Sequence, residues 1–211
     1  MGCTMTRMRI INRTLTAAAL LAATSCGSAV RTGSSPMFLV ISSMAGLRGG
    51  PTPGQASPVL ISDVLTQVIS GGNCTQTNPC PTVFGDNGQA TMLLEKKDVT
   101  SSLAPTTNNE VTINRVHVHY RRADGGGVPG VDVPVDLDSA TTATVPVSGT
   151  GTVGFELVRA QAKFQSPLFQ LRAGGQLGVV ADVTFYGQDR VGNTVSATGS
   201  IQIEFADWGD Q

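Results

Sequence analysis

The stretch that decides the fold is VVADVTFYGQDRVGNTVSATGSIQIEF, residues 179–205, near the C-terminus. Apolar and polar side chains alternate along both of its arms, which is the pattern of β-strands with one buried side and one solvent-exposed side. The residues expected on the buried side are Val179, Ala181, Val183 and Phe185, then Val195, Ala197, Gly199, Ile201, Ile203 and Phe205. Between the arms, DRVGN at 189–193 supplies Asp, Gly and Asn, which favour turns. We therefore predict a β-hairpin whose apolar side is covered by a second sheet.

The same hairpin carries a resemblance to a known family. QDRVGNT at 188–194, followed by an alternating strand, resembles the last hairpin of bacterial immunoglobulin-like domains, many of which end in a D-x-x-G-N turn and a closing strand. The chain departs from antibody-type domains because it has no Cys…Trp…Cys core, and its only Trp is Trp208. The resemblance implies a sandwich architecture and leaves the activity open.

Shorter apolar or alternating runs, separated by turns rich in Gly and Pro, fill the rest of the chain. We expect strands at 37–41, 59–65, 90–95, 111–122, 131–137, 141–147 and 153–164. Pro134 and Pro146 place two of these strands at sheet edges, because proline cannot donate to a ladder. The run at 153–164 also fits a helix, and its position between Gly-rich turns favours a strand. With the hairpin, these runs predict an all-β, antiparallel immunoglobulin-like β-sandwich of about eight strands over residues 36–211.

Composition limits the classes of function. Of the 211 residues, 40% are hydrophobic and only 14% are charged, with 25 Gly and 11 Pro, which suits an extracytoplasmic all-β protein. The formal net charge of -1 provides no basic surface for a polyanion. We therefore expect no nucleic-acid partner.

The N-terminus reads as an export signal. Arg7, Arg9 and Arg13 precede the apolar run TLTAAALLAA at 14–23, which is shorter than the roughly 20 residues that cross a bilayer as a helix. We expect residues 1–25 to be a signal peptide that is removed.

The end of this signal resembles the lipobox of bacterial lipoproteins, since small residues stand directly before a cysteine in ATSCG at 23–27. The resemblance implies that Cys26 carries a diacylglycerol and holds the protein on a membrane of the cell envelope. Gly27, where inner-membrane lipoproteins of enterobacteria have Asp, implies the outer membrane if the host has one. Residues 26–35 would then be a flexible tether. The alternative is ordinary signal-peptidase cleavage, which would leave a soluble secreted protein.

Two cysteines remain once Cys3 leaves with the signal and Cys26 carries the lipid. Cys74 and Cys80 lie close in sequence, and an oxidising compartment favours a disulfide between them. A metal site is the weaker interpretation, because two thiols without a nearby His lack the usual ligand set.

The only two histidines, His117 and His119, lie on a predicted strand in an H-x-H pattern. Residues i and i+2 of a strand point to the same side, so both imidazoles could bind one metal ion if a carboxylate completed the site. Arg115 and Arg121 share that row and would repel a cation, so a polar outer face is the alternative. A second row of candidate oxygen ligands, for calcium, consists of Asp132, Asp136 and Asp138. A solvated strand face explains that row equally well.

No catalytic signature stands out. The sequence has no G-x-S-x-G, H-E-x-x-H or P-loop motif. We predict a non-catalytic, lipid-anchored extracytoplasmic β-sandwich without a cofactor, acting as a binding or structural module toward an envelope protein or a glycan. The alternative is a metal- or small-ligand-binding protein that uses the side of the strand bearing His117 and His119. A carbohydrate-active enzyme on a sandwich scaffold is a third possibility.

Overall fold

The computed structural model describes residues 35–52 and 54–209. The expected signal peptide, the lipidation site Cys26 and the tether up to residue 34 lie outside these residues. Over the two described ranges, no helix has the length and apolar character needed to cross a membrane.

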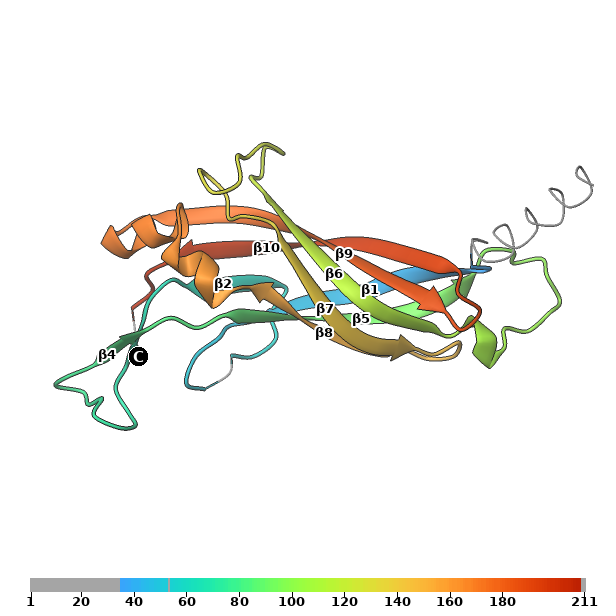
Figure 1. Cartoon of the computed structure of the whole chain (residues 1–211), viewed down its shortest axis with the longest axis horizontal. Coiled ribbons are helices and arrows are strands. Elements are labelled where there is room, and N and C mark those ends of the chain that lie inside the picture. The colour runs from blue at the N-terminus through green and yellow to red at the C-terminus, as the bar shows by residue number, and fades with distance from the viewer. Residues whose placement is uncertain (1–34, 53, 210–211) are drawn as a thin grey trace, which may run out of the picture.

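Two β-sheets pack face to face and form a sandwich (Figure 1). The larger sheet contains, in spatial order, β2 (Val59–Asp63), β10 (Thr194–Ala206), β9 (Gln176–Asp189), β6 (Val111–Arg121) and β7 (Leu137–Val145). The smaller sheet contains β1 (Met37–Leu47), β5 (Asp86–Lys96) and β8 (Gly151–Val158). The remaining elements are the short hairpin of β3 (Thr66–Val68) and β4 (Cys80–Thr82), and the 3-10 helices η1 (Thr107–Asn109), η2 (Ala160–Phe164) and η3 (Leu168–Ala173). All paired neighbours run antiparallel except β2 and β10, which run parallel. The predicted all-β sandwich is confirmed.

The C-terminal hairpin forms in the register that the sequence predicted. β9 and β10 pair continuously, and the apolar rows of β9 and of the second half of β10 are buried, with Ile203 and Phe205 fully inaccessible, whereas Val195 and Ala197 are half-buried. The turn is organised by Asp189, whose carboxylate accepts the backbone N–H groups of Val191 at 3.1 Å and Asn193 at 2.8 Å. Gly192 has φ of 97°, a left-handed conformation that glycine adopts without a steric penalty.

The core lies between the two sheets. Phe155 of β8 meets Phe185 of β9 edge to face, with ring centroids 5.1 Å apart, a favourable geometry for aromatic pairs. The buried hydroxyl of Tyr120 is satisfied, since it donates to the Leu157 carbonyl at 2.6 Å across the core. These contacts tie β6 and β9 of the larger sheet to β8 of the smaller one.

The molecule is elongated and has two distinct ends (Figure 1). At the end that we call the entry end, β1 begins beside the loop after β5 and the β9–β10 turn. Lys97 N–H donates to the Pro36 carbonyl at 2.9 Å, and Arg190 N–H donates to the Asn108 carbonyl at 3.2 Å. The opposite end, which we call the far end, holds η2, η3 and the β3–β4 hairpin.

Some strand predictions need correction. The strand expected at 131–137 does not form. Residues 131–136 are a turn and an irregular segment, and β7 begins only at Leu137. Pro134 removes a ladder donor in the middle of that run, which explains the interruption. The run at 153–164 divides into β8 and the 3-10 helix η2, so the strand prediction holds only for its first half.

Candidate functional site

His117 and His119 lie side by side on the outer, solvent-facing side of β6, as predicted. The register of β6 with β7 pairs His117 with Asp138. His117 Nδ1 lies 3.1 Å from Asp138 Oδ2, and His119 Nδ1 lies 2.9 Å from Asp136 Oδ2. Each imidazole therefore contacts a carboxylate that precedes or begins the neighbouring strand.

The charged groups around these histidines are also paired. Arg121 Nε donates to Asp182 Oδ2 at 2.6 Å, and this hydrogen bond holds the pKa of the Asp182 carboxyl below its usual value. The Ser200 hydroxyl donates to the other oxygen of Asp182 at 2.6 Å. Arg115 lies over the ring of Tyr186, with its guanidinium carbon 4.0 Å from the ring centroid. The outer side of the larger sheet is thus a connected polar surface.

This surface brings the two predicted histidines together with two of the three aspartates that were candidate calcium ligands, and it leaves out the third aspartate. Asp136 and Asp138, which were candidate calcium ligands, join the histidines, while Asp132 lies with the loop before them. Its carboxylate accepts the Val128 N–H and lies 3.8 Å from Arg122. Among residues 35–209, residue 53 excepted, no three His, Cys, Asp or Glu side chains are grouped so that they could hold a metal ion. The strand pairing that places the two carboxylates beside the histidines could not be seen in the sequence alone.

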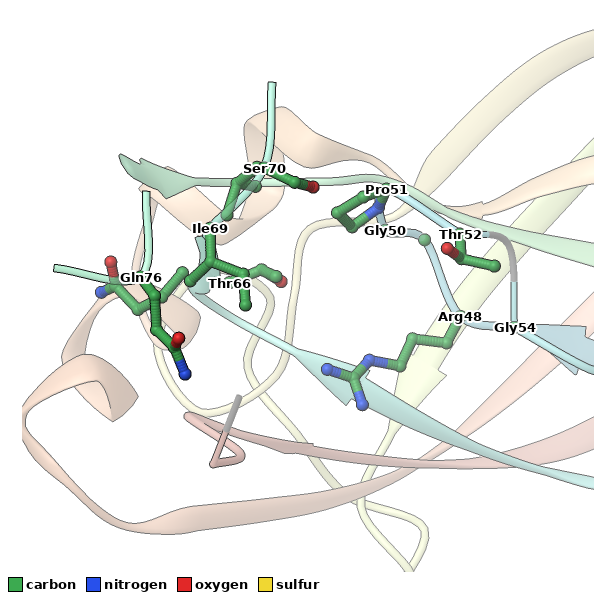
Figure 2. Close-up of a pocket in the computed structure, with 12 residues that line it drawn as sticks. Arg48, Gly50, Pro51, Thr52, Gly54, Thr66, Ile69, Ser70 and Gln76 are labelled. Carbon is green, nitrogen blue, oxygen red and sulfur yellow. The ribbon is translucent and has the colours of Figure 1, made fainter. Parts of the chain in front are cut away.

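The second candidate site is a cavity of 610 Å³ at the far end, between the loop after β1 and the segment that begins with β3 (Figure 2). Figure 2 shows Thr66, Ile69 and Gln76 on one side of it and Arg48 and Thr52 on the other. Its lining mixes polar side chains with the apolar surface of Ile69, which is 43% exposed. A cavity of this size and mixed lining can accept a small molecule or a peptide side chain.

Arg48, the positively charged side chain in the lining of this cavity, already has a partner. Arg48 donates to the buried carboxylate of Asp63 at 2.9 Å, and the Thr66 hydroxyl donates to the same oxygen at 3.2 Å. Trp208, beyond β10, donates its backbone N–H to Asp63 at 3.3 Å. The wall of the cavity is therefore held in place by a network that joins the loop after β1, β2 and the C-terminal segment.

The disulfide stands beside this cavity. Cys74 and Cys80 are bonded as predicted, with their Cα atoms 5.3 Å apart. The bond closes the loop that carries Gln76, so the loop on one side of the cavity is tied back to β4. The lining of the cavity was not predicted from the sequence, because it comes from separate loops without a shared motif.

Comparisons with protein-family models, with characterised proteins and with solved structures found no match for this chain.

Proposed function

We propose that the protein is a non-catalytic, lipid-anchored lipoprotein of the bacterial cell envelope whose β-sandwich is a binding or structural module. The lipobox-like residues 23–27 support the anchor, and the Cys74–Cys80 disulfide agrees with an oxidising compartment. The proposed attachment is through Cys26, on the outer membrane where the host has one.

The observation that carries the proposal is that the start of the β-sandwich and the candidate binding cavity lie at opposite ends of the molecule. β1 begins at the entry end, while the β3–β4 hairpin lies at the far end (Figure 1). The cavity is lined by β3 and by Gln76 of the disulfide loop, so both lie toward the far end. Nine residues, 26–34, separate Ser35 from the proposed lipid, and an extended chain of that length reaches about 30 Å. A protein anchored in this way would present its far end to partners in the envelope, either a protein or a glycan.

The anchor is tested by phase partitioning and intact mass. We expect wild-type protein to enter the detergent phase and to carry the added mass of acyl chains. Cys26→Ser should remain in the aqueous phase, while the control Cys3→Ser, in the segment that is removed, should behave like wild type. A mature wild-type protein without acyl mass would contradict the anchor and favour the soluble secreted alternative.

The binding role is tested by placing a photo-reactive amino acid at the two ends of the anchored protein. Gln76, beside the cavity, is the test position, and Val191, which is 60% exposed in the β9–β10 turn, is the control. Cross-linking to a defined envelope component from position 76 alone supports the far end as the binding surface. Equal products from both positions would argue against it.

A second candidate function is metal or small-ligand binding on the side of β6 that bears His117 and His119. The observation that favours it is the proximity of Asp136 and Asp138, which bring carboxylate oxygens next to both imidazoles. The absence of a metal-competent group of three among the described residues weighs against it. A metal titration, given below, separates the two candidates.

A further inference from the structure

A lysine and an aspartate are buried together behind the cavity. Lys163 lies in η2 and Asp86 begins β5, and their side chains are 1% and 0% exposed. The distance from Lys163 Nζ to Asp86 Oδ2 is 2.7 Å. Removing two charges from water is costly, so a pair this deeply buried needs a complete set of partners or a way to lose its charge.

Three further hydrogen bonds fix this pair. The Gly49 N–H donates to Asp86 Oδ1 at 2.8 Å, and the Ser62 hydroxyl donates to Asp86 Oδ2 at 2.6 Å. Lys163 Nζ donates to the backbone carbonyl of Asp63 at 2.8 Å. The nitrogen and the carboxylate are therefore held in contact, with little freedom to separate.

We propose that Lys163 and Asp86 are joined by an intramolecular isopeptide bond, an amide between Nζ and the carboxyl carbon of Asp86. The ammonium transfers a proton to the carboxylate, and the neutral amine then attacks the carboxyl carbon. The new C–N bond forms as the bond from that carbon to Oδ2 breaks. Two protons of the original ammonium leave with Oδ2 as one molecule of water, and the third stays on the amide nitrogen. The reaction needs no oxidant, reductant or other reagent.

The surroundings suit each stage of this condensation. Burial lowers the pKa of the Lys163 amine, and the attraction of Asp86 opposes this effect only in part, so the neutral nucleophile is favoured relative to a lysine in water. The Gly49 N–H points at the oxygen on which negative charge develops during the attack. The Ser62 hydroxyl donates to the oxygen that leaves, and contact between the reacting groups raises their effective concentration.

The same partners also satisfy the product. Oδ1 becomes the amide oxygen and keeps the hydrogen bond from Gly49, while the amide N–H keeps the Asp63 carbonyl as its acceptor. A buried amide with both groups paired costs far less than a buried ion pair. The other charges nearby are already matched, since the Asp63 carboxylate accepts Arg48 and Thr66.

The bond would fasten η2 to the start of β5, next to the cavity wall. It does not depend on the lipid anchor, so a failed lipidation test would leave this inference untouched.

The test is the intact mass of the purified wild-type protein after reduction of the disulfide. We expect a mass lower by one water molecule than that calculated for the reduced, processed chain together with the acyl mass found in the anchor test. Trypsin should release residues 49–96 covalently joined to residues 160–172, without cleavage after Lys163, and fragmentation should locate the link at Asp86. A wild-type mass without this deficit means that the pair is an ordinary ion pair and overturns the proposal.

Two substitutions locate the bond. Lys163→Arg keeps a positive charge but has no amine that can form this amide, so the full calculated mass should return. Lys97→Arg, at a lysine outside the network, should keep the deficit of one water. A deficit that persists in Lys163→Arg would overturn the assignment to this pair. Because the decisive measurement uses wild-type protein, poor folding of a variant would not obscure the answer.

Discussion

Two isoleucines in adjacent strands give a direct test of the sandwich. Ile203 of β10 is completely buried, whereas Ile61 of β2 is 42% exposed. The two strands pair in parallel, with Ile203 opposite Leu60 and Glu204 opposite Ile61, so both sites belong to one region of the larger sheet. The same substitution at each site therefore compares burial while residue type and neighbourhood stay nearly constant.

Ile203→Ala removes buried apolar atoms and leaves a cavity, so the free energy of unfolding should fall by about 3 to 4 kcal/mol. For a domain of this size, that loss corresponds to a decrease in Tm of about 10 °C. Ile61→Ala removes atoms that are partly hydrated in the folded state and should cost about 1 kcal/mol. Urea unfolding followed by far-UV circular dichroism measures both losses, with the slope m unchanged. Equal losses at the two positions would refute the assignment of Ile203 to the core.

Three further predictions concern the disulfide, the acid stability and the histidines. The Cys74–Cys80 pair should not react with a thiol reagent until a reductant is added, and its reduction should lower stability by about 2 kcal/mol; free thiols in the native protein would argue against the bond. Because the pKa of Asp182 is lower in the folded than in the unfolded chain, its contribution is full above about pH 4 and is lost as the pH falls through the folded value. Asp182→Asn should therefore unfold more easily at pH 7 and show a weaker dependence on acid, whereas identical acid profiles for the variant and wild type would contradict this reasoning. Zinc should leave the NMR signals of His117 and His119 unshifted, since no metal-competent group of three ligands forms among the described residues; zinc-dependent shifts would favour the metal-binding alternative.

The strands that were predicted well are those with a strict period of two. The C-terminal hairpin and β6 alternate over most of their length, and a shift by one residue would expose their entire apolar rows, so the pattern determines the register. The first strand, expected at 37–41, continues to Leu47 because its second half pairs with β5 although it is weakly apolar. That extension depends on a partner distant in sequence, which local pattern does not contain.

The sites were harder to predict for the same reason. The proximity of the two histidines follows from their spacing. The carboxylates beside them come from the end of the irregular segment 131–136 and the start of β7, where the sequence predicted a separate strand. Lys163 was read as part of a strand, and nothing in its local sequence indicated that it would be buried against Asp86. Long-range charge pairs of this kind depend on the complete topology.

The strand order of the larger sheet has a consequence for the time at which the protein can fold. β9 and β10 come last in the sequence, yet they occupy the centre of the sheet, between β2 on one side and β6 on the other. Until residue 206 is available, the earlier strands lack the neighbours that complete their ladders, so the sheet cannot assemble progressively as the chain is synthesised. Pairing over such long sequence separations is slow. The larger sheet should therefore form only after β10 has been synthesised, and loss of β10 should leave an aggregation-prone chain in place of a smaller folded domain.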